Sequence, residues 1–154
     1  IILKLNSFTS YKFVDKLYEA SQRGVKIKLL IRGICCLIPK KLGYSDNIEV
    51  QSVVDRYLEH SRVYVFENGG DKKVFISSAD LMTRNIENRV EVACPIYQDN
   101  LKKQVLDTLE ISANDNVKTR LINSNIQNSF LRNSKSNIRS QWYTYTYFKK
   151  ILNN

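Results

Sequence analysis

Most of the side chains that could carry chemistry lie in one short stretch of the chain, between Glu59 and Glu91. It contains the only histidine of the sequence, His60, and Arg62 follows two positions later. The valine and tyrosine content of residues 61–66 predicts a β-strand, and because side chains alternate along a strand, His60 and Arg62 should point the same way. An imidazole exchanges a proton near neutral pH, and a guanidinium offers forked donors to phosphate oxygens. The pair therefore indicates a site that binds an anionic, phosphorylated ligand and moves a proton or phosphoryl group beside it.

Further polar candidates follow this pair closely: Glu67, Ser77, Ser78, Asp80, Arg89 and Glu91. We expect Ser77 and Ser78 to line the site as hydroxyl donors. Glu91 or Glu67 is expected to orient the imidazole by accepting its second N–H group. Arg89 and Glu91 alternate with valines in a predicted strand, so both should face one side, either toward the ligand or in structural ion pairs.

The start of the chain is expected to add one more cation to the site. Residues 1–6 alternate apolar and polar side chains, residues 11–23 show helical spacing, and residues 25–31 form a β-branched apolar run. A strand, a helix and a strand in succession usually pair their strands in parallel through a right-handed crossover. Ligands gather beyond the carboxyl ends of such strands, and Arg32 comes directly after the second one. Arg32 is therefore a candidate for phosphate binding, although a cation in this position can also simply reach solvent.

The remaining pattern predicts one α/β domain over residues 1–154, with a mixed β-sheet flanked by helices. Further strands are expected over residues 48–54, 61–66, 73–77 and 90–93, and a helix over residues 99–114. The last segment, residues 115–154, is basic and aromatic: from Val117 onward it has seven Lys or Arg and no Asp or Glu. We expect this segment to end in a helix packed on the body of the domain.

The formal net charge of +9 indicates polyanionic partners, namely nucleic acid, an anionic membrane, nucleotides or inorganic polyphosphate, with solubility alone as the simpler explanation. Three cysteines, two of them adjacent, fit neither a disulfide framework nor a zinc site, so we expect buried thiols in a reducing cytoplasm. The chain lacks an initiator methionine and begins inside an apolar alternation. We therefore expect a C-terminal fragment of a longer polypeptide.

The sequence resembles known proteins at two levels, a superfamily motif and a single family. His60-x-Arg62-x(4)-Glu67, followed by Ser77-Ser78-x-Asp80, resembles the H-x-K-x(4)-D … G-S-x-N motif of the phospholipase D superfamily, with Arg for Lys, Glu for Asp, Ser for Gly and Asp for Asn. The strings LYEASQRGVKIKLLIRGICCLIP, VDRYLEHSRVYVFENGGDKKVFISSADLMTRN and RVEVACPIY, with the tail RSQWYTYTYFKKIL, are similar to the C-terminal phospholipase-D-like domain of the polyphosphate kinase 1 family. The second resemblance covers essentially the whole chain.

The resemblance to polyphosphate kinases implies a transferase that moves the terminal phosphate of ATP reversibly onto inorganic polyphosphate. It implies that the phosphorylated histidine lies on a domain upstream of this chain, and that His60 is a second, assisting histidine. Arg32 falls on the family's phosphate-contacting arginine, and Arg62 and Arg89 are expected to bind ATP or polyphosphate with it. The resemblance also implies Mg²⁺ held by residues outside this chain, and no metal ligand is assigned within it.

The other partners expected are ADP, the upstream domains of the same chain and, in the full-length form, further copies in a homo-oligomer. The isolated fragment should be inactive, and we expect a cytoplasmic location, with a peripheral position at the membrane as an alternative. Two rival functions stay open from the sequence. One is half of a phosphodiesterase of the phospholipase D type, and the other is a polyanion-binding or nucleic-acid-binding module that uses the basic, aromatic arm. We expect no specific nucleic acid.

Overall fold

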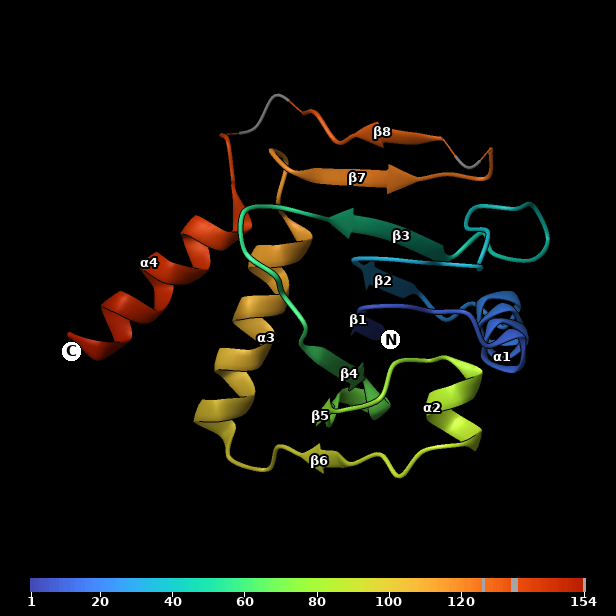
Figure 1. Ribbon diagram of the computed structural model, residues 1–154, viewed down its shortest axis with the longest axis horizontal. Coiled ribbons are helices and arrows are strands. Elements are labelled where there is room, and N and C mark those ends of the chain that lie inside the picture. The colour runs from blue at the N-terminus through green and yellow to red at the C-terminus, as the bar shows by residue number, and fades with distance from the viewer. Residues whose placement is uncertain (126, 134–135, 154) are drawn as a thin grey trace.

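The computed structural model describes residues 1–125, 127–133 and 136–153, and within them eight strands form one mixed β-sheet. The strands are β1 (Ile2–Leu5), β2 (Ile27–Ile31), β3 (Ile48–Val53), β4 (Arg62–Phe66), β5 (Lys73–Ser77), β6 (Ala93–Pro95), β7 (Thr119–Ile122) and β8 (Asn128–Phe130). Their order across the sheet is β6-β5-β4-β1-β2-β3-β7-β8 (Figure 1). The predicted α/β class with a mixed sheet is confirmed.

The strands in the centre of the sheet pair in parallel, and the outer strands on both sides pair antiparallel. β1 pairs in parallel with β2, and β2 with β3. On its other side β1 pairs antiparallel with β4, which continues through a hairpin into β5. The predicted strand–helix–strand unit is confirmed, with α1 (Tyr11–Gln22) as the crossover helix. Gly24 follows this helix with a φ of 85°, a conformation that favours glycine and ends the helix.

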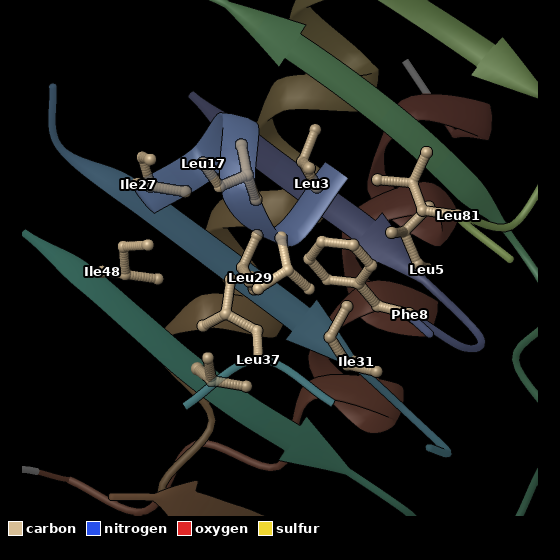
Figure 2. Packing of buried hydrophobic residues seen from close by; sticks show 12 residues of the cluster. Leu3, Leu5, Phe8, Leu17, Ile27, Leu29, Ile31, Leu37, Ile48 and Leu81 are labelled. Atoms are coloured by element: carbon tan, nitrogen blue, oxygen red, sulfur yellow. The ribbon is translucent and has the colours of Figure 1, made fainter. Parts of the chain in front are cut away.

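Two hydrophobic clusters lie on opposite faces of the sheet. One joins α1 to alternate residues of the central strands, with Phe8 and Leu81 between them, and Figure 2 shows these side chains together. The other joins Leu30, Val63 and Val65 to Leu109 of α3 (Asp99–Ala113). Because neighbouring residues of β2 such as Leu29 and Leu30 belong to different clusters, this strand is buried from both sides, as is typical of central parallel strands.

The segment from residue 115 onward contains two strands that the sequence did not predict, in addition to the expected helix. The expected final helix is present as α4 (Ser140–Leu152), and it contacts α3 through a hydrogen bond from the Tyr147 hydroxyl to Asp107 at 2.7 Å. The polar stretch before it is not a free arm, because it supplies β7 and β8, which extend the sheet from β3. Within this helix, Trp142 and Tyr145 are 65% and 56% exposed.

Two further expectations need correction. The strand predicted over residues 90–93 begins only at Ala93, and a short helix, α2 (Thr83–Glu87), fills part of the polar run before it. Cys36 and Cys94 are exposed rather than buried, and only Cys35 is largely covered, which raises the pKa of its thiol to about 11. Within the described ranges, no helix has the length and apolar character to cross a membrane.

Candidate functional site

One edge of the sheet collects nearly all of the predicted site residues. The parallel strands β1 and β2 end there, and Asn6 and Arg32 directly follow them. β4 runs the opposite way, so its first residue, Arg62, lies at the same edge, opposite Ser77 at the end of β5. Residues that are far apart in the sequence therefore meet where several strands begin or end.

His60 and Arg62 lie together, as predicted, although β4 begins only at Arg62 and His60 lies in the loop before it. Nη2 of Arg62 is 2.9 Å from Nε2 of His60, and Nη1 donates to the backbone carbonyl of His60 at 3.1 Å. A guanidinium carries only donors, so this contact fits the His60 tautomer in which Nε2 accepts and Nδ1 carries the hydrogen. His60 is exposed, which leaves Nδ1–H open to a ligand.

Asp80 fixes the position of Arg62 through a largely buried ion pair. Nη2 of Arg62 also donates to Oδ2 of Asp80 at 2.9 Å, in an ion pair whose side chains are 15% and 3% exposed. Oδ1 of Asp80 accepts the backbone N–H groups of Asn6 at 2.7 Å and of Ser7 at 3.1 Å. Burial alone would raise the pKa of Asp80, but the hydrogen bonds from Arg62, Ser7 and Asn6 outweigh it and hold this pKa below its usual value.

Asn6 is a site residue that the sequence interpretation missed. Its side-chain oxygen accepts hydrogen bonds from Nε of Arg32 at 2.7 Å and from Nη2 of the same guanidinium. Its backbone N–H binds Asp80, and its carbonyl accepts the N–H of Gly33 at 2.8 Å. Asn6 thus connects the Arg32 guanidinium to the Asp80–Arg62–His60 chain. The signal that could have revealed it is its place directly after β1, equivalent to that of Arg32 after β2.

The two serines do not serve as free hydroxyl donors. Ser77 donates to the carbonyl of Val92 at 3.0 Å, and Ser78 donates to the carboxylate of Glu91. Ser78 also accepts the N–H of Val92 at 3.0 Å. Both hydroxyl hydrogens are therefore used to fasten the segment around Glu91 to the end of β5, which contradicts the expectation that they line the site as donors.

Glu91 sits beside the site but does not bind the imidazole. Ser78 and Asn85 (2.6 Å) donate to its carboxylate, and these hydrogen bonds lower its pKa, helped by the charges of Arg89 and Arg62. Arg89 lies in an irregular, exposed segment before β6, not in a strand, and makes no hydrogen bond or ion pair within the described part of the chain. Its guanidinium is free to meet a ligand.

Glu67 is not brought to this edge. It follows β4 at the opposite end of the strand, next to the turn Asn68–Gly70, where it pairs with Lys72 at 3.6 Å in an exposed contact. The five residues of β4 lie between His60 and Glu67 in the sequence. At about 3.3 Å per residue, the side chains of His60 and Glu67 are roughly 20 Å apart. The expectation that Glu67 orients the imidazole is wrong.

The residues of this edge suit phosphate binding better than metal binding. Arg32 and Arg62 supply guanidiniums and His60 supplies an N–H donor, and the exposed Arg89 lies two residues before Glu91. In the stretches that the structure describes, no group of three His, Cys, Asp or Glu side chains could hold a metal ion. The donor set of the described residues therefore does not fit a Mg²⁺ site.

Comparisons with known proteins agree with one another. The family model described as "Polyphosphate kinase C-terminal domain 2" matches residues 1–141. Over 152 residues the chain is 51% identical to the polyphosphate kinase of Escherichia coli strain K12 and 53% identical to that of Yersinia pestis, covering 98% of this chain and 22% of each relative. The crystal structure of polyphosphate kinase from Porphyromonas gingivalis superposes with a TM-score of 0.94 at 45% identity, over 97% of this chain and 23% of that one. The chain thus spans about a fifth of the length of the proteins it matches.

Proposed function

The chain belongs to the polyphosphate kinase family, as its C-terminal domain, and from this premise we propose that it forms one wall of a phosphoryl-transfer site. In this site the terminal phosphate of ATP is transferred reversibly to inorganic polyphosphate. The observation that carries the proposal is the continuous chain His60–Arg62–Asp80–Asn6–Arg32 at one edge of the sheet.

The guanidiniums are proposed to bind and neutralise phosphate. Arg62 is held by Asp80 and Arg32 by Asn6, so both cations are oriented before any ligand arrives. Phosphoryl transfer needs little covalent help from the protein, and positioning together with charge stabilisation lowers most of the barrier. Arg89, which is exposed and unpaired among the described residues, adds a third cation that a polyanionic chain can reach.

His60 is proposed as the assisting group rather than the phosphorylated nucleophile. With Nε2 accepting from Arg62, its Nδ1–H can donate a hydrogen bond to a phosphate oxygen. When Arg62, still paired with Asp80, donates to a ligand phosphate instead of His60, Nε2 is released and can take up or return a proton at the leaving oxygen. The phosphohistidine of the reaction is proposed to lie outside this chain, in the polypeptide upstream.

The domain is proposed to work only as part of a larger assembly. We propose that Mg²⁺ is held by residues outside this chain, where it neutralises charge on the transferred phosphates. The upstream domains of the same polypeptide supply the facing wall, the full-length protein is a homo-oligomer, and it resides in the cytoplasm. The strong positive charge supports polyanionic substrates in general.

Replacement of His60 tests this proposal. In the full-length kinase that carries this domain, His60→Ala should lower polyphosphate synthesis from ATP at least about 100-fold, the usual scale of a general acid–base contribution. Because His60 is exposed and packs on no core residue, the thermal unfolding of the variant should match the parent protein. Lys12→Ala, an exposed change on α1, is the control and should retain normal synthesis. Near-normal turnover in His60→Ala would rule out the assigned role.

A further inference from the structure

The loop that carries His60, residues 54–61, is held by the beginning of α4, through Arg139 directly before the helix and Gln141 in its first turn. Arg139 donates from Nε and Nη2 to the two carboxylate oxygens of Asp55, each at 2.7 Å. The Asp55 side chain is 2% exposed, and the hydrogen bonds from Arg139 keep its pKa below the usual value despite this burial. A forked guanidinium–carboxylate pair defines geometry as well as attraction, so it fixes the start of the loop.

Gln141 fixes the middle and the end of the same loop. Its Oε1 accepts the N–H of Tyr57 at 3.0 Å, and its Nε2 donates to the carbonyl of Tyr57 at 2.8 Å. Nε2 also donates to Oε1 of Glu59 at 3.0 Å, while Oε2 of Glu59 accepts from Lys4 of β1. Glu59 directly precedes His60. The Gln141 side chain therefore holds Tyr57 and Glu59, which lie just before His60 in the loop.

Apolar packing cannot hold this loop in place. Val54, Tyr57 and Leu58 are 58%, 67% and 71% exposed, so the loop contributes little to either hydrophobic cluster. A loop with few buried apolar contacts opens at low free energy unless other interactions restrain it. Here the restraint comes from the polar contacts to Arg139, Gln141 and Lys4.

The turn of α4 that makes these contacts is itself anchored. Asp115, which is fully buried, accepts the backbone N–H of Ser140 through Oδ2 at 2.6 Å. Its Oδ1 accepts the N–H groups of Val117, Lys118 and Thr119, which lead into β7. The beginning of α4 is therefore tied to the end of α3 and to the sheet, and it offers a rigid support for the loop.

We propose that Arg139 and Gln141 are positioning residues for the phosphoryl-transfer reaction, acting through the loop that places His60. The inference rests on the proposed function of His60. Without these two side chains the loop loses its support, and the imidazole spends less time beside Arg62. Neither residue is proposed to touch the substrate. Their loss should therefore lower kcat and leave the KM for ATP nearly unchanged.

The test compares Gln141→Ala with Lys149→Ala in the full-length kinase. Lys149 lies on the same helix, is exposed and makes no hydrogen bond or ion pair within the described ranges, so it is a matched control. The amide of Tyr57 in Gln141→Ala should exchange with deuterium at least about ten-fold faster, because its hydrogen-bond acceptor on Gln141 is removed. Amides of β1 and β2 should be unchanged. The kcat should fall about ten-fold or more, with the KM for ATP within about two-fold.

A double-mutant cycle separates positioning from general support of the fold. If Gln141 acts through His60, Gln141→Ala should change the residual turnover of the His60→Ala enzyme by less than about two-fold. Unchanged exchange of the Tyr57 amide, or an unchanged kcat, would overturn the inference. Normal turnover in His60→Ala would instead contradict the proposed function, while the exchange rates would still show whether Gln141 holds the loop.

Discussion

Replacing Asp80 should destabilise the domain more than any other single change at the site. Its carboxylate is almost fully buried and accepts from Arg62, Asn6 and Ser7, so Asp80→Ala removes three hydrogen bonds and leaves a largely buried guanidinium without its counter-charge. Removing one partner of a buried ion pair typically costs about 3 to 5 kcal/mol. Because the Arg62 side chain keeps 15% exposure, the lower end of this range is expected.

The amide variant separates charge from hydrogen bonding. Asp80→Asn keeps the shape, but its single side-chain oxygen cannot serve Arg62 and the two backbone N–H groups together. We expect it to lower the free energy of unfolding by about 1 to 3 kcal/mol, as for other hydrogen bonds to charged groups. Asp71→Asn is the control, since Asp71 also has a lowered pKa through Lys73 but lies in an exposed turn, and it should change stability little.

The pH dependence follows from the sign of the pKa shift. The pKa of Asp80 is lower in the folded chain than its ordinary value of 3.8, so the unfolded chain takes up the proton first as the pH falls. The stability that this carboxylate contributes is present above pH 3.8 and is lost below it, down through the folded pKa. Urea unfolding of the 154-residue chain between pH 7 and pH 3 should show a smaller loss of stability for Asp80→Asn than for the parent. An Asp80→Ala chain within about 1 kcal/mol of the parent at pH 7 would refute the assigned cost of the unpaired guanidinium.

Other predictions concern the roles of single residues and of the chain as a whole. Glu67→Gln in the full-length kinase should keep turnover within about two-fold, because Glu67 lies at the far end of β4, and a larger loss would contradict its placement. Arg32→Lys should raise the KM for ATP about ten-fold, since an ammonium cannot reproduce the fork that Asn6 orients; an unchanged KM would remove Arg32 from the phosphate site. The isolated 154-residue chain should make no polyphosphate from ATP and Mg²⁺, and detectable synthesis would show that no second wall is needed. It should still bind polyphosphate weakly in a calorimetric titration, with affinity that falls as salt is raised, and a salt-independent affinity would argue against binding through charge.

The sequence was most informative where structure depends on local periodicity. The β1–α1–β2 unit follows from apolar spacing and a glycine stop, and the proximity of His60 and Arg62 follows from their spacing in the sequence, although His60 precedes β4. The position of Arg32 at the sheet edge follows from the parallel pairing of its strand. These inferences use only neighbours in the sequence, for which the spacing of side chains is nearly fixed.

The errors arose where a partner comes from a distant strand. Asn6 and Asp80 are 74 positions apart, and no spacing rule relates them. The prediction that Ser77 and Ser78 are free hydroxyl donors fails because their partners, Val92 and Glu91, lie in a segment that the sequence alone does not place beside them. Glu67 matched a motif by count, but the extended strand β4 separates it from His60. β7 and β8 were missed because their side chains are largely polar, and their pairing with β3 depends on tertiary context.

The contact between Tyr57 and Gln141 joins residues 84 positions apart, which has a consequence for the order in which the domain can mature on the ribosome. At synthesis rates of about 5 to 20 residues per second, roughly 4 to 17 s pass between the emergence of the His60 loop and that of its support on α4. The central sheet can pair during this interval, while the imidazole has no fixed place. The nascent chain would therefore hold a nearly complete sheet with an unfinished site until α4 emerges.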